Sequence, residues 1–445
     1  MSSSPAPGGR RDLPRVLGVV QATALVIGTI IGTSIFVQPS EVTRLVPTAS
    51  GILVAWALAG TLTMLFALTC AELASAFPAT GGVYVFLREA YSRRLAFLWG
   101  WSSVWIIHTG VIAAIAMVCA RYLAYFAPAA TDHERIVAVG VVVAVSALNY
   151  AGVRIGAVVL TLSTAAKLLA IAVLLVAGLA AATPVAVPTW HPGLTELETV
   201  PLAQLLLGAG AGLFAFGGAH AVTYVAGETT DPVRTVPRAL TIGTLVVTLC
   251  YIALNALYLY ALPLDTVRTS PRVAAEVAAV LIGPVGGSAV ASMVVLSGMG
   301  TITGIALAGP RLYLSMAADG MMPAWLDAVH PRFRTPHRAI LLQAGWAIVL
   351  VASGQYATLF ARVVYVEWFF FALLAAGLFV LRRRADYRPP ARMWGFPLTP
   401  AIVVVASAAV VVSHLVAQPR DALIGAAMVA AGWPVGVWFE RRRRQ

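Results

Sequence analysis

The sequence predicts an all-α polytopic membrane protein with about twelve transmembrane helices. Hydrophobic residues make up 60% of the 445 positions and charged residues only 11%, whereas a soluble protein of this size is about a quarter charged. The apolar runs have the length of helical spans rather than of barrel strands, and a helix satisfies its own backbone in hydrocarbon. Arginines fall between these runs, where topology signals are found.

Each apolar run is expected to form one span. The runs lie at residues 16–37, 51–77, 95–126, 135–152, 155–182, 202–226, 239–262, 284–316, 337–354, 357–381, 398–417 and 422–439. Residues 183–201 form the most polar outward connection. The outward segment 263–283 is too polar to span, and we expect a short helix there.

Arginine counts set the expected orientation. Segments on the N-terminal side of the membrane hold 22 arginines and the opposite segments hold 7. Because loops rich in lysine and arginine stay in the cytoplasm, both termini are expected there, with the protein in the cell membrane. The net charge of +12 is spread over these loops without a basic domain, so no nucleic-acid partner is expected.

Both ends of the sequence are polar, and the three cysteines lie inside apolar runs. Residues 1–15 are polar and lack the order of a signal peptide, so we expect a disordered cytoplasmic terminus and a retained first span. Residues 441–445 form a basic cytoplasmic tail. Cys70, Cys119 and Cys250 lie inside apolar runs, which suits helix packing rather than a disulfide framework.

The first span contains the stretch VIGTIIGTSIF, in which Gly28 and Gly32 precede the helix-disfavouring pair Thr33 and Ser34. A break here would free backbone amides, which form a carboxylate site where protein or a watery cavity covers them. The alternative is a small-residue packing face, since glycines four apart also pack helices in membranes.

The sixth span is the second glycine-interrupted stretch. Gly208, Gly210 and Gly212 alternate in mid-span and are followed by Gly217 and Gly218. Each glycine costs a helix about 1 kcal/mol relative to alanine. Transporters built from inverted five-helix repeats carry broken helices at corresponding positions, and spans 1 and 6 stand five apart. This spacing favours a midplane substrate site over simple packing.

The motifs resemble those of the amino acid–polyamine–organocation superfamily, nearest to bacterial members of its L-amino-acid-transporter-like branch. They read GTIIGTSIFVQPSEV, AELASAFPATGGVY, LFAFGGAHAVTYVAGETTDPVRTVPRAL and PRLYLSMAADGMMPAWLDAVHPRFRTP. The resemblance implies one transporter domain over 16–440 with a LeuT-like 5+5 inverted repeat. Repeat one covers 16–182, repeat two covers 202–381, and two extra helices follow at 398–439. It also implies alternating access and amino acid substrates.

The resemblance implies a backbone site in span 1. The family's Gly-Ser-Gly, whose amides hold the substrate carboxylate, falls on Gly32, Thr33 and Ser34. Ser34 replaces the second glycine and narrows the allowed backbone. Carbonyls near Ile30 and Phe214 would accept from the α-ammonium group.

In span 6 the resemblance implies that Phe214 covers the substrate and that the break at Gly217 and Gly218 lines the pocket. Ala219 and His220 stand where many members have a bulky residue and then a polar or acidic one. The lost bulk suggests a roomier pocket, and the lost acid argues against a cationic substrate side chain. His220 is kept as a substrate-binding candidate, with the packed histidine as the alternative.

Lys167 is the one lysine of the chain and lies near the middle of span 5. A charged group there costs roughly 2.5–3.5 kcal/mol, which favours a functional role over snorkelling to the interface. The resemblance puts it beside span 1, where sodium-coupled relatives bind an ion. A fixed ammonium predicts sodium independence, but burial favours the neutral amine, so proton carriage is the alternative.

Other polar residues also lie inside or at the ends of the spans. His108 is either a pocket residue or a packed histidine, and Glu367 pairs with an arginine such as Arg362, caps a polar cavity or relays protons. Glu72 and Glu228 lie near cytoplasmic span ends and are expected in gate salt bridges. Trp99, Trp101 and Trp105 are interpreted as belt or packing residues without a site role.

The leading functional hypothesis is secondary transport of amino acids by sodium-independent exchange, with proton-coupled amino acid or polyamine symport as the alternative. An amino acid sensor without turnover is the hypothesis of another class. No metal spacing, phosphate loop or paired nucleophile indicates an enzyme, and we expect no cofactor.

The expected partners are an amino acid substrate and the lipid bilayer. Animal members of the branch bind a single-span glycoprotein through a cysteine in the loop after span 3. Here that loop is PAATDHER, without cysteine. We therefore expect no disulfide-linked subunit, and a monomer or homodimer.

Overall fold

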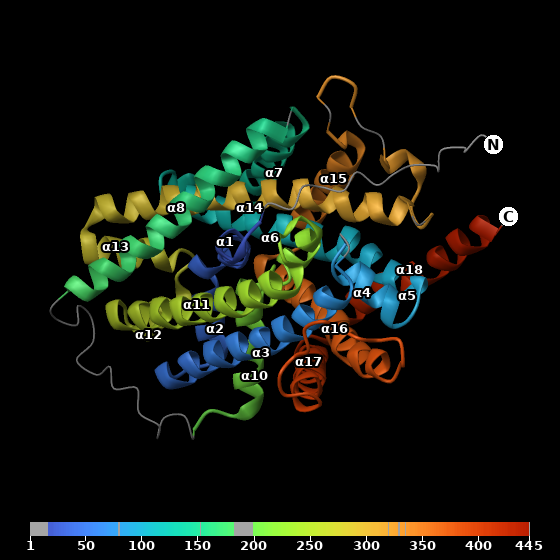
Figure 1. Cartoon of the computed structure of the whole chain (residues 1–445). Helices are drawn as coiled ribbons and strands as arrows, with labels where there is room; N and C mark the ends of the chain where they lie inside the picture. The colour runs from blue at the N-terminus through green and yellow to red at the C-terminus, as the bar shows by residue number, and fades with distance from the viewer. Residues whose placement is uncertain are drawn as a thin grey trace, which may run out of the picture.

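The computed structural model describes residues 17–78, 81–151, 153–181, 199–318, 320–327, 330–333 and 335–444. Over these ranges the protein is helical, and its extended pairing is limited to an isolated bridge between Leu17 and Thr229 (Figure 1). The predicted all-α class is confirmed at this level. The expected outward connection at 183–201 lies mostly outside the described residues.

Nine helices of the described chain are long and apolar enough to cross a membrane. They are α3 (Ala49–Ala76); the continuous rod of α5 (Arg93–Ser102), a π-helical segment (Ser103–Ile107) and α6 (His108–Leu123); α7 (Glu134–Ala151); α8 (Val153–Ala180); α11 (Pro232–Ala261); α14 (Pro284–Ala318); α16 (Tyr356–Arg382); α17 (Leu398–Ala417); and α18 (Pro419–Arg444). Shorter apolar helices are α1 (Val19–Ile30), α10 (Leu202–Leu213), α13 (Val273–Ile282) and α15 (His337–Ser353). The chain is thus a multi-pass membrane protein.

Several of these helices begin at residues that cap them. The Thr48 side chain accepts from the amide of Gly51 at the start of α3 at 3.2 Å. Asp231 accepts from the amide of Arg234 at the start of α11 at 3.3 Å, with a proline in the first helical turn. Such caps satisfy amides that have no partner inside the helix.

Short helices join the spans. Gly81 and Gly82 have φ angles of 136° and 51°, which turn the chain between α3 and α4 (Val83–Ala90). The expected helix at 263–283 is in fact two helices, α12 (Leu264–Thr269) and α13. The chain breaks between them at a proline, residue 271, which restricts the residue before it.

The helices pack in pairs around the two interrupted spans. α3 lies beside α11 and α8 beside α14, while α1 packs on α11 near the centre (Figure 1). Buried Ala22, Val26 and Ile30 form the inward face of α1. Outer helices expose large apolar side chains, such as Leu179 of α8 at 88% exposure, which suits contact with lipid.

Candidate functional site

Span 1 is interrupted at the predicted glycine. Helix α1 ends at Ile30, and the chain resumes in a single turn (Ser34–Phe36) and then α2 (Gln38–Leu45). The Gly32 amide turns back to the Ile30 carbonyl at 2.7 Å. In the described chain the amides of Thr33 and Ser34 find no acceptor, although both residues are buried. Buried amides of this kind normally have a partner, so this stretch can bind an acceptor group.

Span 6 is interrupted at Gly217 and Gly218, as predicted. Helix α10 ends at Leu213, and Phe214–Phe216 form one tight turn before the glycines. Gly218 has a φ of 87°, and a Cβ there would lie 3.1 Å from the carbonyl oxygen of Thr29. Only glycine combines this backbone with so close an approach. The two breaks therefore touch each other.

The other glycines of span 6 do not interrupt the helix, which corrects the prediction for them. Helix α10 runs through Gly208, Gly210 and Gly212. A Cβ at Gly208 would lie 2.5 Å from a methyl carbon of Val46, and one at Gly212 would lie 3.3 Å from the Cβ of Ala59. These glycines allow close helix packing, because tertiary contact outweighs their poor helix propensity.

Tyr251 of α11 joins the two breaks, and sequence reasoning missed it. Its hydroxyl lies 3.1 Å from the Ile30 carbonyl oxygen and 3.0 Å from that of Ala215. Both are main-chain acceptors at a break, and the tyrosine is fully buried. A hydroxyl has one proton, so it serves one carbonyl fully at a time. The second carbonyl stays able to accept from another donor.

Lys167 lies where the prediction put it, beside span 1. From α8, its ammonium donates to the carbonyl oxygen of Gly28, one turn before the break, and the residue is 4% exposed. On the other side of the break, the Thr33 hydroxyl lies 3.2 Å from that of Ser297 in α14. Span 1 is thus held at its break by α8, α11 and α14.

Phe214 lies under a cluster of rings from α16. Its ring centroid is 6.3 Å from that of Tyr356 and 5.6 Å from that of Phe360. Gln38 fixes this cluster, because it donates to the Ala211 carbonyl and accepts from the Tyr356 hydroxyl, both at 2.7 Å. Phe214 is 7% exposed, so this end of the site is covered.

His220 is enclosed by aromatic rings rather than by charges. Its ring centroid lies between 5.2 and 6.3 Å from those of four aromatic residues: Phe66, Trp99, Tyr224 and Phe371. Trp99 was expected to have no site role, yet it is part of the wall around His220. Its neighbours Trp101 and Trp105 pack on α18 and α15, as expected of packing residues.

His108 and Glu367 lie in the interior, and Glu367 does not form the predicted ion pair with Arg362. His108 directly follows the π-helical segment, and its Nδ1 has no hydrogen-bond partner in the described chain. Arg362 pairs with Asp421 of α18 rather than with Glu367, so the proposed pairing within α16 is wrong. Glu72 pairs with Arg382. The side chain of Glu228 lies outside the described residues.

The described residues contain no group of three or more side chains suited to hold a metal ion. The site instead consists of main-chain amides and carbonyls at two helix breaks, an ammonium group and aromatic walls. Such groups can hold a small zwitterion: the amides donate to a carboxylate, and the carbonyls accept from an ammonium group.

Comparison with known proteins gives a consistent result. A family model described as amino acid permease matches residues 17–439. The serine/threonine exchanger SteT of Bacillus subtilis (strain 168) is 30% identical over 441 residues, covering 97% of this chain and 98% of the relative. The b(0,+)-type amino acid transporter 1 of Mus musculus is 27% identical, covering 92% of this chain and 84% of the relative. The large neutral amino acids transporter small subunit 2 of Homo sapiens is 28% identical, covering 98% of this chain and 83% of the relative.

Proposed function

The chain belongs to the amino acid permease family of the amino acid–polyamine–organocation superfamily, and from this premise we propose that it exchanges amino acids across the cell membrane by alternating access. Members of the family are transporters and not enzymes, and the relatives support amino acid transport by this chain. Exchange is favoured because a relative that is 30% identical is named a serine/threonine exchanger.

The proposed fold has twelve spans. The nine long apolar helices and the shorter α1, α10 and α15 would supply them, and α13 would lie outside the membrane. We assign one transporter domain over 16–440, with the inverted repeats at 16–182 and 202–381 and two further helices at 398–439. In support, the interrupted spans come first and sixth in this order, as the 5+5 arrangement requires.

The proposed site takes the substrate between the two breaks. The carboxylate would accept from the amides of Thr33 and Ser34 near Gly32. The α-ammonium group would donate to the carbonyls of Ile30 and Phe214. The unmatched amides of span 1 carry this proposal, because nothing else in the described chain satisfies them.

The substrate side chain would lie along Gly217, Gly218 and His220, with Phe214 covering it from outside. The aromatic walls around His220 favour neutral side chains over charged ones. This agrees with relatives whose names specify serine, threonine and large neutral amino acids.

We propose that the Lys167 ammonium group takes the place of a sodium ion, so that transport does not depend on sodium. Its ammonium lies on the Gly28 carbonyl next to the break, so a fixed positive charge is already present where an ion would act. Proton symport is the second candidate, since Lys167 and Glu367 are interior titratable groups.

Both termini are proposed to be cytoplasmic, from the 22-to-7 arginine distribution. The bundle of spans 1, 2, 6 and 7 would rock against the other spans. We propose a monomer or homodimer without a disulfide-linked subunit, since the loop at 128–135 has no cysteine.

Counterflow in proteoliposomes tests this function. Liposomes loaded with excess unlabelled amino acid should accumulate the trace labelled amino acid transiently when they contain the protein. A thermal-shift screen of the purified protein against the common amino acids selects the substrate to use. Binding without counterflow would indicate a sensor, and absence of both for every amino acid would refute the proposal.

A further inference from the structure

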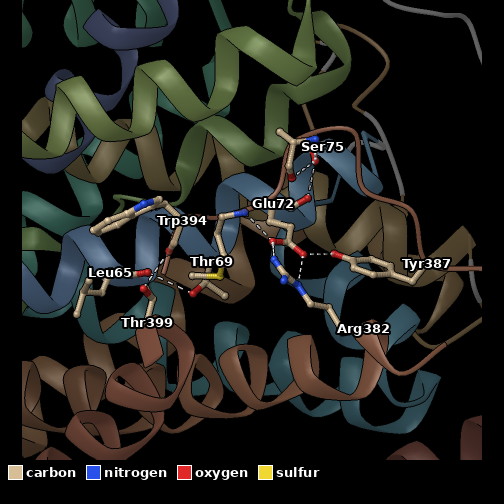
Figure 2. Close-up of polar contacts among 10 residues, drawn as sticks. Leu65, Thr69, Glu72, Ser75, Arg382, Tyr387, Trp394 and Thr399 are labelled. Atoms are coloured by element: carbon tan, nitrogen blue, oxygen red, sulfur yellow. Dashed lines mark hydrogen bonds and ion pairs between the residues drawn. The ribbon is translucent and has the colours of Figure 1, made fainter. Parts of the chain in front are cut away.

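Four groups donate to the Glu72 carboxylate. They belong to Arg382, the last residue of α16, and to the segment that follows it (Figure 2). Arg382 donates through Nε to Oε1 at 2.9 Å and through a terminal nitrogen to Oε2. The Tyr387 hydroxyl donates to Oε1 at 3.2 Å, and the Met393 amide donates to Oε2 at 2.7 Å. Burial, and then the neighbouring carboxylate, raise the pKa of Tyr387, so its hydroxyl stays a donor.

The connecting segment 383–397 forms further hydrogen bonds at the same end of the molecule. The Ser75 hydroxyl lies 3.0 Å from the Ala391 carbonyl and accepts from the Ala391 amide at 3.2 Å. Arg384 donates to the carbonyls of Glu89 and Ala90 at 2.7 and 3.0 Å, at the end of α4. The segment therefore crosses the ends of both α3 and α4.

The Glu72 cluster joins parts that the proposed mechanism separates. Helix α3 is span 2 and belongs to the rocking bundle, whereas α16 and the connecting segment are span 10 and its continuation. The Glu72 side chain is fully buried and that of Arg382 is 19% exposed. Separating a buried pair leaves each charge without its partner, which is far more costly than losing an exposed pair.

At the opposite end of the site, neutral hydrogen bonds join span 1 to the other spans: the hydroxyls of Tyr356 and Tyr122 donate, both at 2.7 Å, to the Gln38 side chain and the Phe36 carbonyl. There, Arg121 of α6 reaches Glu41 of α2 at 4.0 Å, and Arg121 also pairs with Glu134 of α7 at 2.8 Å. Arg121 therefore keeps a partner when α2 moves away. By comparison, the contact at Glu72 is an ion pair made by two hydrogen bonds from Arg382, with two further donors, and its carboxylate is fully buried.

Resting on the proposed function, we propose that the Glu72 cluster is a cytoplasmic latch that disfavours opening of the site to the cytoplasm. The latch is the set Glu72, Arg382, Tyr387 and the Met393 amide. Opening requires α3 to leave the connecting segment and break these bonds. A carrier without substrate then rarely opens inward, which favours exchange over net flux.

Flux measurements test the latch in proteoliposomes that contain the full chain. Glu72→Gln keeps the shape but loses the charge, so net efflux without outside substrate should rise about tenfold or more relative to exchange. Tyr387→Phe removes one donor and should give a smaller rise. Glu440→Gln is the matched control, because its pair with Arg94 joins α18 and α5, outside the rocking bundle.

A distance measurement decides the latch independently of transport. Spin labels are placed at Ala76→Cys in α3 and Asp386→Cys in the connecting segment, with the three native cysteines replaced by alanine. The parent chain should give one short distance, and Glu72→Gln and Tyr387→Phe should add a longer one. Unchanged distances in both variants overturn the latch, whatever the fluxes. Longer distances in a chain that exchanges no amino acid would support the latch and refute the proposed function.

Discussion

Replacing Tyr251 with phenylalanine tests the connection between the two breaks. The change removes one hydroxyl and leaves the ring, so the Ala215 carbonyl loses the Tyr251 donor, while the Ile30 carbonyl keeps the Gly32 amide as a donor. A buried carbonyl left without a donor costs about 1–3 kcal/mol. If the hydroxyl keeps the Ile30 carbonyl and the break in span 6 in place for the substrate ammonium group, that loss weakens amino acid binding by about 5- to 150-fold.

Tyr258, two turns further along α11, provides the matched control. It is equally buried, but its hydroxyl has no hydrogen-bond partner in the described chain. Tyr258→Phe should therefore leave binding unchanged within about twofold. Affinities come from titrating the amino acid in thermal-shift and counterflow measurements on both variants. Equal losses in the two variants would refute the reasoning, since the shared effect would then reflect general loss of packing.

Three further predictions concern the breaks and the interior charge. Exchange should persist when choline replaces sodium, and Lys167→Met should lower it at least tenfold by removing a charge-assisted bond to Gly28; collapse in choline would exclude the fixed-charge role. Gly218→Ala should lower counterflow about tenfold, because alanine at this φ costs about 1–2 kcal/mol and its Cβ would press on the Thr29 carbonyl; normal counterflow would show that the backbone adjusts. Ser34→Gly should tighten amino acid binding without changing selectivity, as measured by thermal shift; no change at all would exclude the Ser34 amide as a ligand.

The features that the sequence predicted well depend on local physics. Helix-length apolar runs mark the spans, and the breaks at Gly32 and at Gly217 and Gly218 fall where small, flexible residues interrupt them. Lys167 was informative because a lone cation in an apolar run is costly wherever it packs. Each of these signals is contained within a single span.

Features that depend on distant contacts could not be read in the same way. Tyr251 looks like any aromatic residue of an apolar helix, and its role depends on carbonyls 221 and 36 residues away. The sequence suggested Glu367 as the partner of Arg362. The packing of α18 against α16 instead places Asp421 beside Arg362. Gly208 and Gly212 resembled helix breakers because the sequence does not show which helix lies against them.

Close packing at Gly210 makes helix α17 part of the site's support. A Cβ at Gly210 would lie 3.0 Å from a ring carbon of His414, so α17 lies directly against the helix that leads into the second break. Helix α17 also packs on α3 and α16. A ten-helix version ending before Leu398 would leave this flank of α10 facing lipid. We therefore expect that residues 16–381 alone do not form a stable carrier, and shortened designs should retain α17.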